Sequence, residues 1–145
     1  MKSCINGFNP EEIFQLYAFV EAYETAGIKS YNKQTCLFQE HPELKGLLLV
    51  SKNVKCHKSC SEAMKSLDFK AMDEEIYFIK NKQSNLLSLL KHLRNSIAHA
   101  CAVKHENKVL ITDFKVTRPV DFSARGRVSF DIINQFTQVL NKVVL

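Results

Sequence analysis

Arg94, Asn95 and His99 are the residues of this chain whose types and spacing suit chemistry on an anionic group. A histidine has a reference pKa near neutrality, so His99 can take or give a proton at physiological pH. The guanidinium of Arg94 presents a planar fork of donors that can stabilise charge building on an oxygen atom. Asn95 follows the arginine directly and can orient His99 or hold an anionic oxygen. We therefore take these three as the candidate catalytic residues.

A long amphipathic helix, expected from about Ser84 to Cys101, must position these side chains. Its apolar residues recur at helical spacing in one stripe: Leu86, Leu89, Leu90, Leu93, Ile97 and Ala100. At about 100° per residue, the other side carries a polar stripe: His92, Asn95, Ser96 and His99. Arg94 lies on the shoulder of the apolar stripe, about 140° from His99 on the same wheel. One helix alone therefore does not bring Arg94 and His99 together.

Two more helices are predicted near the ends of the chain. The first begins at Asn9, a good capping residue, has Pro10 at its first position and stops at Gly27. The last runs from about Ser129 to Val143 and has a clear apolar face: Ile132, Ile133, Phe136, Val139, Leu140 and Val143. Both have the length and periodicity of core helices.

The middle of the chain predicts shorter elements. His41-Pro42-Glu43 indicates a helix start, although Gly46 and the apolar run Leu47 to Val50 leave a short strand as the alternative. Further helices are predicted across Lys58 to Leu67 and Asp73 to Lys80.

The segment after the motif helix predicts a small β-hairpin. Residues 103–105 and 109–111 flank the turn-like stretch 106–108. Residues 117–127, with Pro119 and Gly126, predict a loop that carries three arginines: Arg118, Arg125 and Arg127. Arg125 and Arg127 could bind substrate phosphate near the motif, or could belong to a plain lead-in to the last helix.

The composition indicates one folded domain spanning residues 1–145. Hydrophobic residues make up 46% of the chain, enough for a real core. The formal net charge is +5 and the sequence pI is near 9.0, which favours contact with phosphates and therefore with nucleic acid. The five cysteines are an odd number, which argues against a complete disulfide framework and favours a reduced, cytoplasmic protein.

Several classes of protein are not indicated. No apolar stretch approaches the roughly 20 residues of a membrane span, and none has the length of a signal peptide. The chain has no Gly-rich phosphate loop, G-x-S-x-G elbow or HExxH motif, so a triphosphatase, a serine hydrolase or a metalloprotease is not expected. We expect no cofactor.

A zinc site in the segment Cys56-His57-Lys58-Ser59-Cys60 is the alternative to two small core cysteines. A closed structural site needs four ligands, and no second pair of CxxC or HxxxH type exists in the chain. We therefore predict no metal. The lysines Lys52, Lys55, Lys58 and Lys65 form a basic run typical of a solvated face, which could also follow an RNA backbone.

The string Leu93-Arg94-Asn95-Ser96-Ile97-Ala98-His99 resembles the R-x(4–6)-H motif of the HEPN superfamily, especially HEPN proteins of bacterial plasmids and defence loci. The resemblance implies an all-α, HEPN-like up-and-down bundle of four to five helices, here with a small β-hairpin after the motif helix. It also implies a homodimer, in which Arg94 and His99 of two protomers form a composite active site.

The resemblance further implies a metal-independent endoribonuclease. RNA carries its own nucleophile, the 2′-hydroxyl, and His99 would take that proton or protonate the leaving 5′-oxygen while Arg94 stabilises the phosphorane. The products would be a 2′,3′-cyclic phosphate and a 5′-hydroxyl. His92 and Ser96, on the same stripe as Asn95, join Arg125 and Arg127 as candidate substrate-binding residues.

The expected role is that of a toxin or an anti-phage effector, with an antitoxin as a further expected partner besides RNA. One alternative is a catalytically silent HEPN module that binds RNA or a protein. Another is an unrelated helical interaction protein that carries the motif by chance. The discriminating feature is whether Arg94 and His99 face an open cleft.

Overall fold

The computed structural model describes residues 7–68, 70–79, 84–115 and 121–143, and pairs five strands among them into one sheet. The strand order is β1-β2-β5-β4-β3. The strands are β1 (Lys55–Lys58), β2 (Glu75–Phe78), β3 (Val103–His105), β4 (Lys108–Phe114) and β5 (Phe122–Ser129). β1 and β2 run parallel, and the other neighbours are antiparallel. The prediction of an all-α bundle is therefore wrong, because the hairpin is part of a larger mixed sheet.

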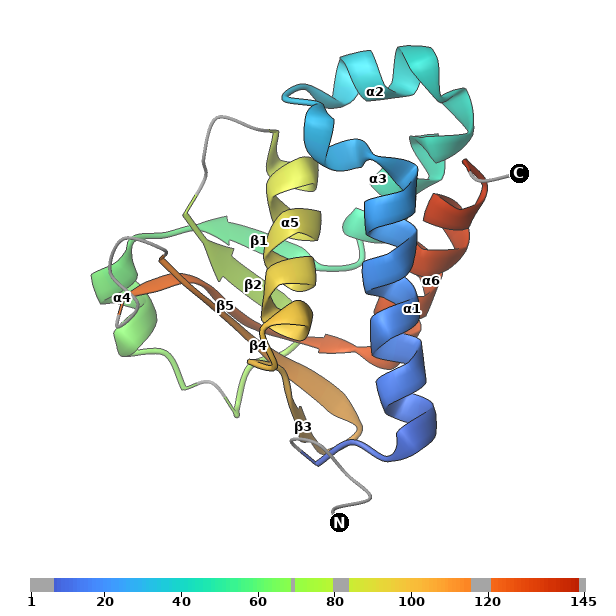
Figure 1. The fold of residues 1–145 in the computed structure, drawn as a ribbon. Helices are drawn as coiled ribbons and strands as arrows, with labels where there is room; N and C mark the ends of the chain where they lie inside the picture. Colours follow the sequence, from blue (N-terminus) through green and yellow to red (C-terminus); the bar gives the residue numbers. More distant parts are fainter. Residues whose placement is uncertain (1–6, 69, 80–83, 116–120, 144–145) are drawn as a thin grey trace.

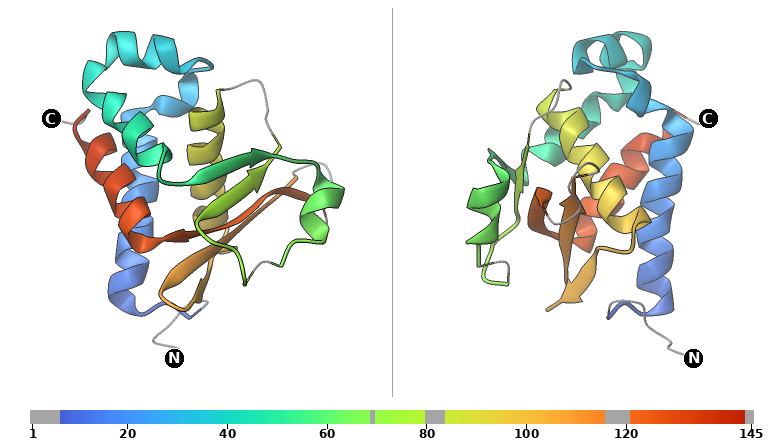
Figure 2. Two further views of the ribbon diagram at one scale, coloured as in Figure 1. Left: turned by 180° about the vertical axis from the view of Figure 1, so that it is seen from behind. Right: turned by 60° about the vertical axis from the view of Figure 1, so that its left-hand side comes forward.

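Helices cover both faces of this sheet unequally (Figures 1 and 2). The long helices α1 (Pro10–Ala26), α5 (Asn85–Ala98) and α6 (Phe130–Asn141) pack on one face. The short α4 (Ser61–Lys65) lies on the other face, as the right-hand view of Figure 2 shows. The remaining short helices lie together at one end of the long helices. They are the 3-10 helices Ile28–Ser30 and Pro42–Lys45 and the α-helices α2 (Gln34–Glu40) and α3 (Gly46–Ser51). None of the helices in the described ranges is long and apolar enough to cross a membrane.

The main core lies between the sheet and the three long helices. Its fully buried side chains come from both layers, and include Phe19, Phe136, Leu89, Ile76 and Ile111. Alternation along each strand sends every second side chain into this core. On β4 the inward residues are Val109, Ile111 and Asp113, all of them buried.

The predicted starts of the long helices and the predicted end of α1 are confirmed, while α5 ends at Ala98, three residues before the predicted Cys101. The Asn9 side chain accepts a hydrogen bond from the Glu12 amide, the Glu12 carboxylate accepts one from the Asn9 amide, and Gly27 closes α1 at φ 68°. The Ser84 and Ser129 hydroxyls cap the starts of α5 and α6 by accepting hydrogen bonds from the Leu87 and Ile132 amides. The hairpin after the motif helix is also confirmed, with a two-residue turn at Glu106 and Asn107, both at positive φ.

Two predictions from the middle and end of the chain are wrong. Residues 73–80, predicted as a helix, contain β2, in which Ile76 and Phe78 are buried while Glu75 and Tyr77 are half-buried. Four residues are too few for that period-two pattern to outweigh a helical one. Residues 117–127, predicted as a loop, contain most of β5, although residues 116–120, with Arg118 and Pro119, lie outside the described residues.

Gly126 explains why β5 fits between its neighbours. A Cβ atom at this position would lie 2.4 Å from the Glu75 carbonyl oxygen and 2.8 Å from the Ile76 Cα. Only glycine allows the two backbones to approach this closely. Gly126, which supported the prediction of a loop, is therefore the residue that lets the central strand β5 pair with β2.

The shorter helices differ from their predicted bounds. The helix expected over Lys58 to Leu67 is reduced to α4, because β1 occupies Lys55–Lys58. The open choice at residues 47–50 is resolved as helix, since this run lies in α3.

Candidate functional site

Helix α5 lies between α1 and the sheet and is therefore buried on more than its apolar stripe. His92 is only 5% exposed and Ser96 is fully buried, although both belong to the predicted polar stripe. Both meet the sheet: the Ser96 hydroxyl accepts a hydrogen bond from the Thr112 amide at 3.0 Å. Ser96 is therefore not accessible to a substrate in this conformation, which differs from the expectation that it lines the site. His92 is almost buried and presents only a small part of its ring to the surface.

The end of α5 sets the position of His99. The Cys101 amide donates to the Ser96 carbonyl at 2.8 Å and the Ala100 amide to the Ile97 carbonyl at 3.1 Å, which is the hydrogen-bond pattern of a Schellman motif. Ala100 takes the left-handed conformation, φ 57°, that glycine usually supplies at this place. His99 is thus the C-cap residue directly after the helix, and its side chain is exposed.

A buried carboxylate on β4 connects two residues of the motif helix. Asp113 Oδ2 lies 2.8 Å from His92 Nδ1 and accepts a hydrogen bond from Asn95 Nδ2 at 3.3 Å. His92 Nε2 lies 3.3 Å from the Ile79 carbonyl oxygen. The two ring nitrogens of His92 thus bridge a carboxylate of β4 and a backbone carbonyl just after β2. Both side chains of the His92–Asp113 contact are buried.

Asn95 links Asp113 to Arg94 through two hydrogen bonds. Its amide nitrogen donates to Asp113, so its Oδ1 is free to accept a hydrogen bond from Arg94 Nη1 at 3.0 Å. Arg94 Nε lies 2.7 Å from Glu24 Oε1 on α1. The guanidinium is therefore held from two sides, by a carboxylate of α1 and by its own neighbour on α5.

Glu24 is also shared with Lys29, whose Nζ donates to it at 2.8 Å. The hydrogen bond from Lys29, followed by the charges of Arg94 and Lys29, holds the pKa of Glu24 below its ordinary value against the opposing effect of burial. Burial and the Glu24 charge raise the pKa of the neighbouring Tyr23 to about 12. These shifts mark Glu24 as an ionised carboxylate that neutralises part of the local positive charge.

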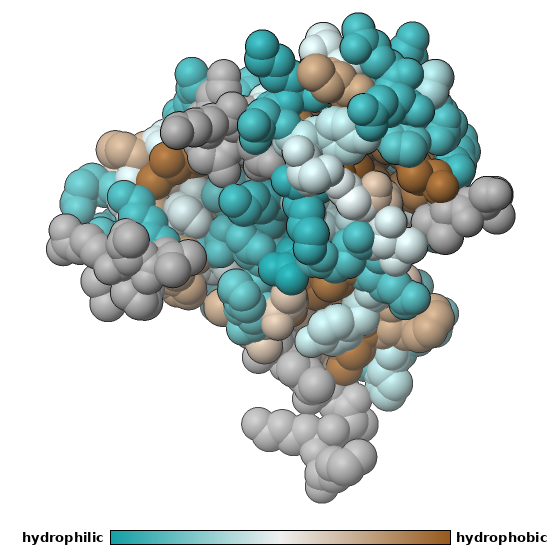
Figure 3. Space-filling view, turned by 45° about the horizontal axis from the view of Figure 1, so that its top comes forward, coloured by the Kyte–Doolittle hydropathy of each residue, from teal (hydrophilic) through white to brown (hydrophobic). Residues whose placement is uncertain are grey.

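Two open pockets flank Asn95 on this surface. One, which we call the histidine pocket, is lined by Ile79, Lys91, His92, Asn95, His99, Asp113, Phe114, Lys115 and Ser123. The other, the arginine pocket, is lined by Tyr23, Glu24, Lys29, Lys91, Arg94 and Asn95. Lys91 and Asn95 line both. In Figure 3 hydrophilic side chains gather over the middle of the face that carries α5 and α1.

One protomer therefore places Arg94 and His99 in adjacent pockets and not in one. This agrees with the wheel, on which the two residues point in different directions. The imidazole can transfer a proton within the histidine pocket, and the guanidinium can stabilise an anion at the arginine pocket. A reaction that needs both on one phosphate requires that phosphate to lie between them or a second copy to complete the site.

Arg125 and Arg127 lie elsewhere. Their register partners Thr112 and Leu110 alternate with the inward residues of β4, so both arginines lie on the α4 side of the sheet. Arg125 Nη1 donates to the Met64 carbonyl at 3.0 Å, and burial lowers the pKa of Arg125. Arg127, 9% exposed, donates to the Lys70 and Met72 carbonyls. The structure does not bring either arginine to the motif, and both hold the α4 segment against the sheet.

Three residues of the site were missed by the sequence analysis: Asp113, Glu24 and Lys91. Asp113 carried a signal, because it continues the alternation of Val109 and Ile111 and is therefore an acid on a buried strand face. Glu24 carried none, since its partner Arg94 is distant in the sequence. Lys91 is four residues before Asn95 and eight before His99, so helical spacing puts it on the same face of the helix as these two residues.

The segment that suggested zinc is divided between two elements. Cys56 and His57 follow each other on β1 and so point to opposite faces, while Cys60 precedes α4. The His57 ring stacks on Tyr77 at 4.5 Å. No group of three or more His, Cys, Asp or Glu among the described residues is placed to hold a metal ion.

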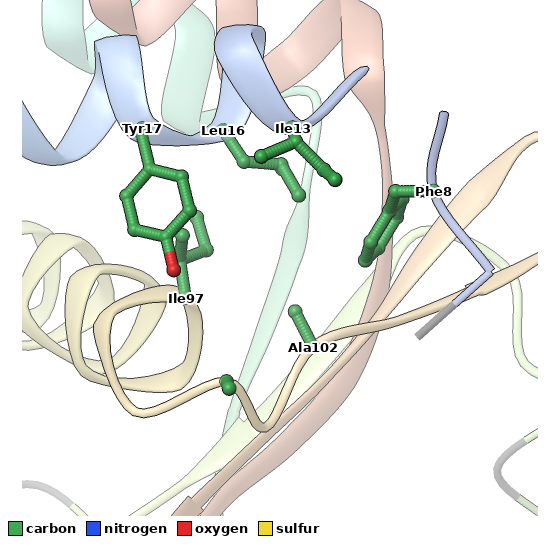
Figure 4. A pocket seen from close by; sticks show the side chains of 7 residues that line it. Phe8, Ile13, Leu16, Tyr17, Ile97 and Ala102 are labelled. Atoms are coloured by element: carbon green, nitrogen blue, oxygen red, sulfur yellow. The ribbon is translucent and has the colours of Figure 1, made fainter. Parts of the chain in front are cut away.

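A third pocket is apolar and lies beyond the end of α5 (Figure 4). It is lined by Phe8, Ile13, Leu16, Tyr17, Ile97, Ala100 and Ala102. Close to it on α1, Phe14 is 75% exposed and Tyr17 46% exposed. None of the residues that line this pocket in the described part of the chain is suited to acid–base catalysis near neutral pH, and large apolar side chains beside it are uncovered.

Comparison with known proteins adds one finding. The model of a protein family described as HEPN pEK499 p136 matches residues 2–145. Comparison with curated proteins and with solved structures found no match.

Proposed function

This chain belongs to the HEPN pEK499 p136 family, and from this premise we propose that it is a metal-independent endoribonuclease. The observation that carries the proposal is the placement of His99 and Arg94 in two open pockets joined by Asn95. Membership of the family by itself supports only a ribonuclease-like or nucleotide-related role, since a fold does not fix an activity.

The proposed reaction uses the RNA as its own nucleophile. The 2′-oxygen forms a bond to phosphorus, its proton passes to an imidazole, and the bond from phosphorus to the 5′-oxygen breaks as that oxygen gains a proton. Arg94 stabilises the charge on the non-bridging oxygens. The products are a 2′,3′-cyclic phosphate and a 5′-hydroxyl.

A homodimer would supply the second imidazole. Two copies of His99, one from each protomer, would then act as base and acid, and each Arg94 would face the scissile phosphate from the other side. The uncovered apolar side chains of α1, Phe14 and Tyr17, support such an interface, because surfaces of this kind are rarely left to solvent. Sedimentation of the wild-type chain and of Phe14→Glu tests this: a dimer that becomes a monomer supports it, and a monomeric wild type contradicts it.

The cellular role that fits this activity is that of a toxin or an anti-phage effector in the cytoplasm, with an antitoxin as a partner. An enzyme that cuts RNA without a cofactor is harmful unless restrained, so such a role requires control. Arrested growth on expression that is relieved by His99→Ala would support this role.

The test of the activity is cleavage of labelled tRNA and single-stranded RNA in EDTA. Cutting that leaves cyclic phosphate ends and is lost in His99→Ala supports the proposal. His41→Ala is the matched control, because His41 lines neither pocket.

The alternative is a catalytically silent module that binds RNA or a protein. The ion pair of Arg94 with Glu24 favours it, since a guanidinium already paired with a carboxylate is less available to a phosphate. A folded dimer that binds RNA and never cuts it would select this alternative.

A further inference from the structure

We propose that Lys91, Lys115 and Phe114 form a binding track for single-stranded RNA that crosses the histidine pocket and reaches the arginine pocket. The proposal deepens the proposed function and rests on it. It assigns the phosphates to the two lysines and a splayed base to the phenylalanine.

The spacing of residues on α5 defines the direction of the track. Lys91, Asn95 and His99 follow one another at intervals of four residues and so share one face of the helix. At about 1.5 Å per residue they extend over roughly 12 Å of its length. Lys91 lines both pockets, which makes it the cation that connects them.

The charges along this track favour an anion. Lys91 is exposed, and neither it nor Lys115 forms an ion pair with any residue that the structure describes. The two carboxylates nearby are already engaged, Glu24 by Lys29 and Arg94, and Asp113 by His92 and Asn95. Two ammonium groups that form no ion pair with the described residues, beside acids that already have partners, attract phosphates.

Phe114 adds the feature that selects single strands. It is among the residues that line the histidine pocket and is 38% exposed. Its ring stacks on Phe122 with ring centroids 5.5 Å apart, and Arg125 lies over Phe122 at 4.8 Å, so the ring is at the edge of the pocket toward the α4 side of the sheet. Bases stack on exposed aromatic rings only when they are splayed out of a helix. A duplex keeps its bases paired and could use only the lysines.

Binding must be measured separately from cleavage. We would titrate the full chain into a fluorescein-labelled 2′-O-methyl oligonucleotide, which lacks the 2′-hydroxyl nucleophile, and follow anisotropy over a range of salt concentrations. Lys91→Met should weaken binding several-fold and make the slope of log K against log salt shallower by about 0.7 for one lost phosphate contact. Phe114→Ala should weaken binding to the single strand by about fivefold or more and leave binding to a duplex unchanged.

Lys142→Met is the matched control, because Lys142 is exposed and lines neither pocket. Circular dichroism of each variant checks the fold. Identical affinities and slopes for Lys91→Met and Lys142→Met would overturn the track, and so would equal losses of single-strand and duplex binding in Phe114→Ala. Binding through Lys91 and Phe114 without cleavage of ordinary RNA would support the track and contradict the nuclease, so the two failures are distinguishable.

Discussion

The arginine pocket contains Arg94 and the histidine pocket contains His99, and the two motif residues differ in whether they form an ion pair. In the arginine pocket three ionic groups are paired with one another, because Glu24 contacts both Arg94 and Lys29. In the histidine pocket His99, Lys91 and Lys115 face solvent or the pocket without an ion pair among the described residues. Arg94 is thus held in place, whereas His99 is available.

The difference follows from where each residue lies on α5. Arg94 is within the helix and faces α1, so an acid from that helix can reach it. His99 is at the end of the helix, next to the last residues of β4, and nothing in the described ranges pairs with it. A fixed cation suits charge stabilisation, and an exposed imidazole suits proton transfer.

The largest effect is expected from His99→Ala. Loss of a positioned acid or base should lower the rate of RNA cleavage by about 10² to 10⁴-fold, with little change in stability because the side chain is exposed. Single-turnover cleavage assays and thermal melts would measure the two quantities. A variant that cuts as fast as the wild type would remove the histidine pocket from the reaction.

Asp113→Ala should have the next largest effect, on stability. It removes the hydrogen-bond partner of the buried His92 ring and frees Asn95 from the sheet, so the free energy of unfolding should fall by about 1–3 kcal/mol. Urea denaturation measures this change. Asp131→Ala is the control, because Asp131 is at the exposed start of α6 and should cost less than about 1 kcal/mol. Equal costs would mean that Asp113 does not hold the motif helix to the sheet.

Glu24→Gln should change the arginine pocket alone. Removing the negative charge should tighten RNA binding a few-fold, while the rate of cleavage falls a few-fold because Arg94 loses one of its two supports. Anisotropy and single-turnover rates separate the two effects. An unchanged rate would show that Asn95 alone is enough to orient the guanidinium.

The same variant has a defined pH dependence. The pKa of Glu24 is lowered in the folded protein, so its contribution to stability is present above the ordinary value of 4.5 and is lost as the pH falls through the lower, folded value. The wild type should therefore be more stable than Glu24→Gln near neutrality, and this difference should shrink in acid. Denaturation at several pH values would show the convergence, and a constant difference would contradict the ion pair.

The long helices could be predicted from the sequence because their signals are local. Asn9, Ser84 and Ser129 are capping residues directly before apolar residues at helical spacing, and all three cap helices in the structure. The turn at Glu106 and Asn107 is local as well. These signals need no knowledge of what the element packs against.

The sheet could not be predicted, because its pairings are not local. β2 has four residues, and it is a strand because β5, some fifty residues later, lies beside it at Gly126. The site shares this limit. The motif gave Arg94, Asn95 and His99, while the burial of His92 and Ser96 depends on β4 covering α5. The helical-wheel prediction assumed that α5 has one buried side. In this fold α5 is buried on two sides, against α1 and against β4.

The smallest expected effect concerns the residue that ends α5. Ala100 takes a left-handed conformation, φ 57°, which costs an L-residue about 1–2 kcal/mol and glycine almost nothing. Ala100→Gly should therefore raise the free energy of unfolding by up to about 1 kcal/mol and the melting temperature by about 2–4 °C. Ala98→Gly, inside the last turn of the helix, should lower stability by about 0.5–1 kcal/mol. If Ala100→Gly also leaves cleavage unchanged, the strained cap serves only to end the helix. If cleavage falls while stability rises, the rigidity of alanine at this position is what directs His99 into its pocket.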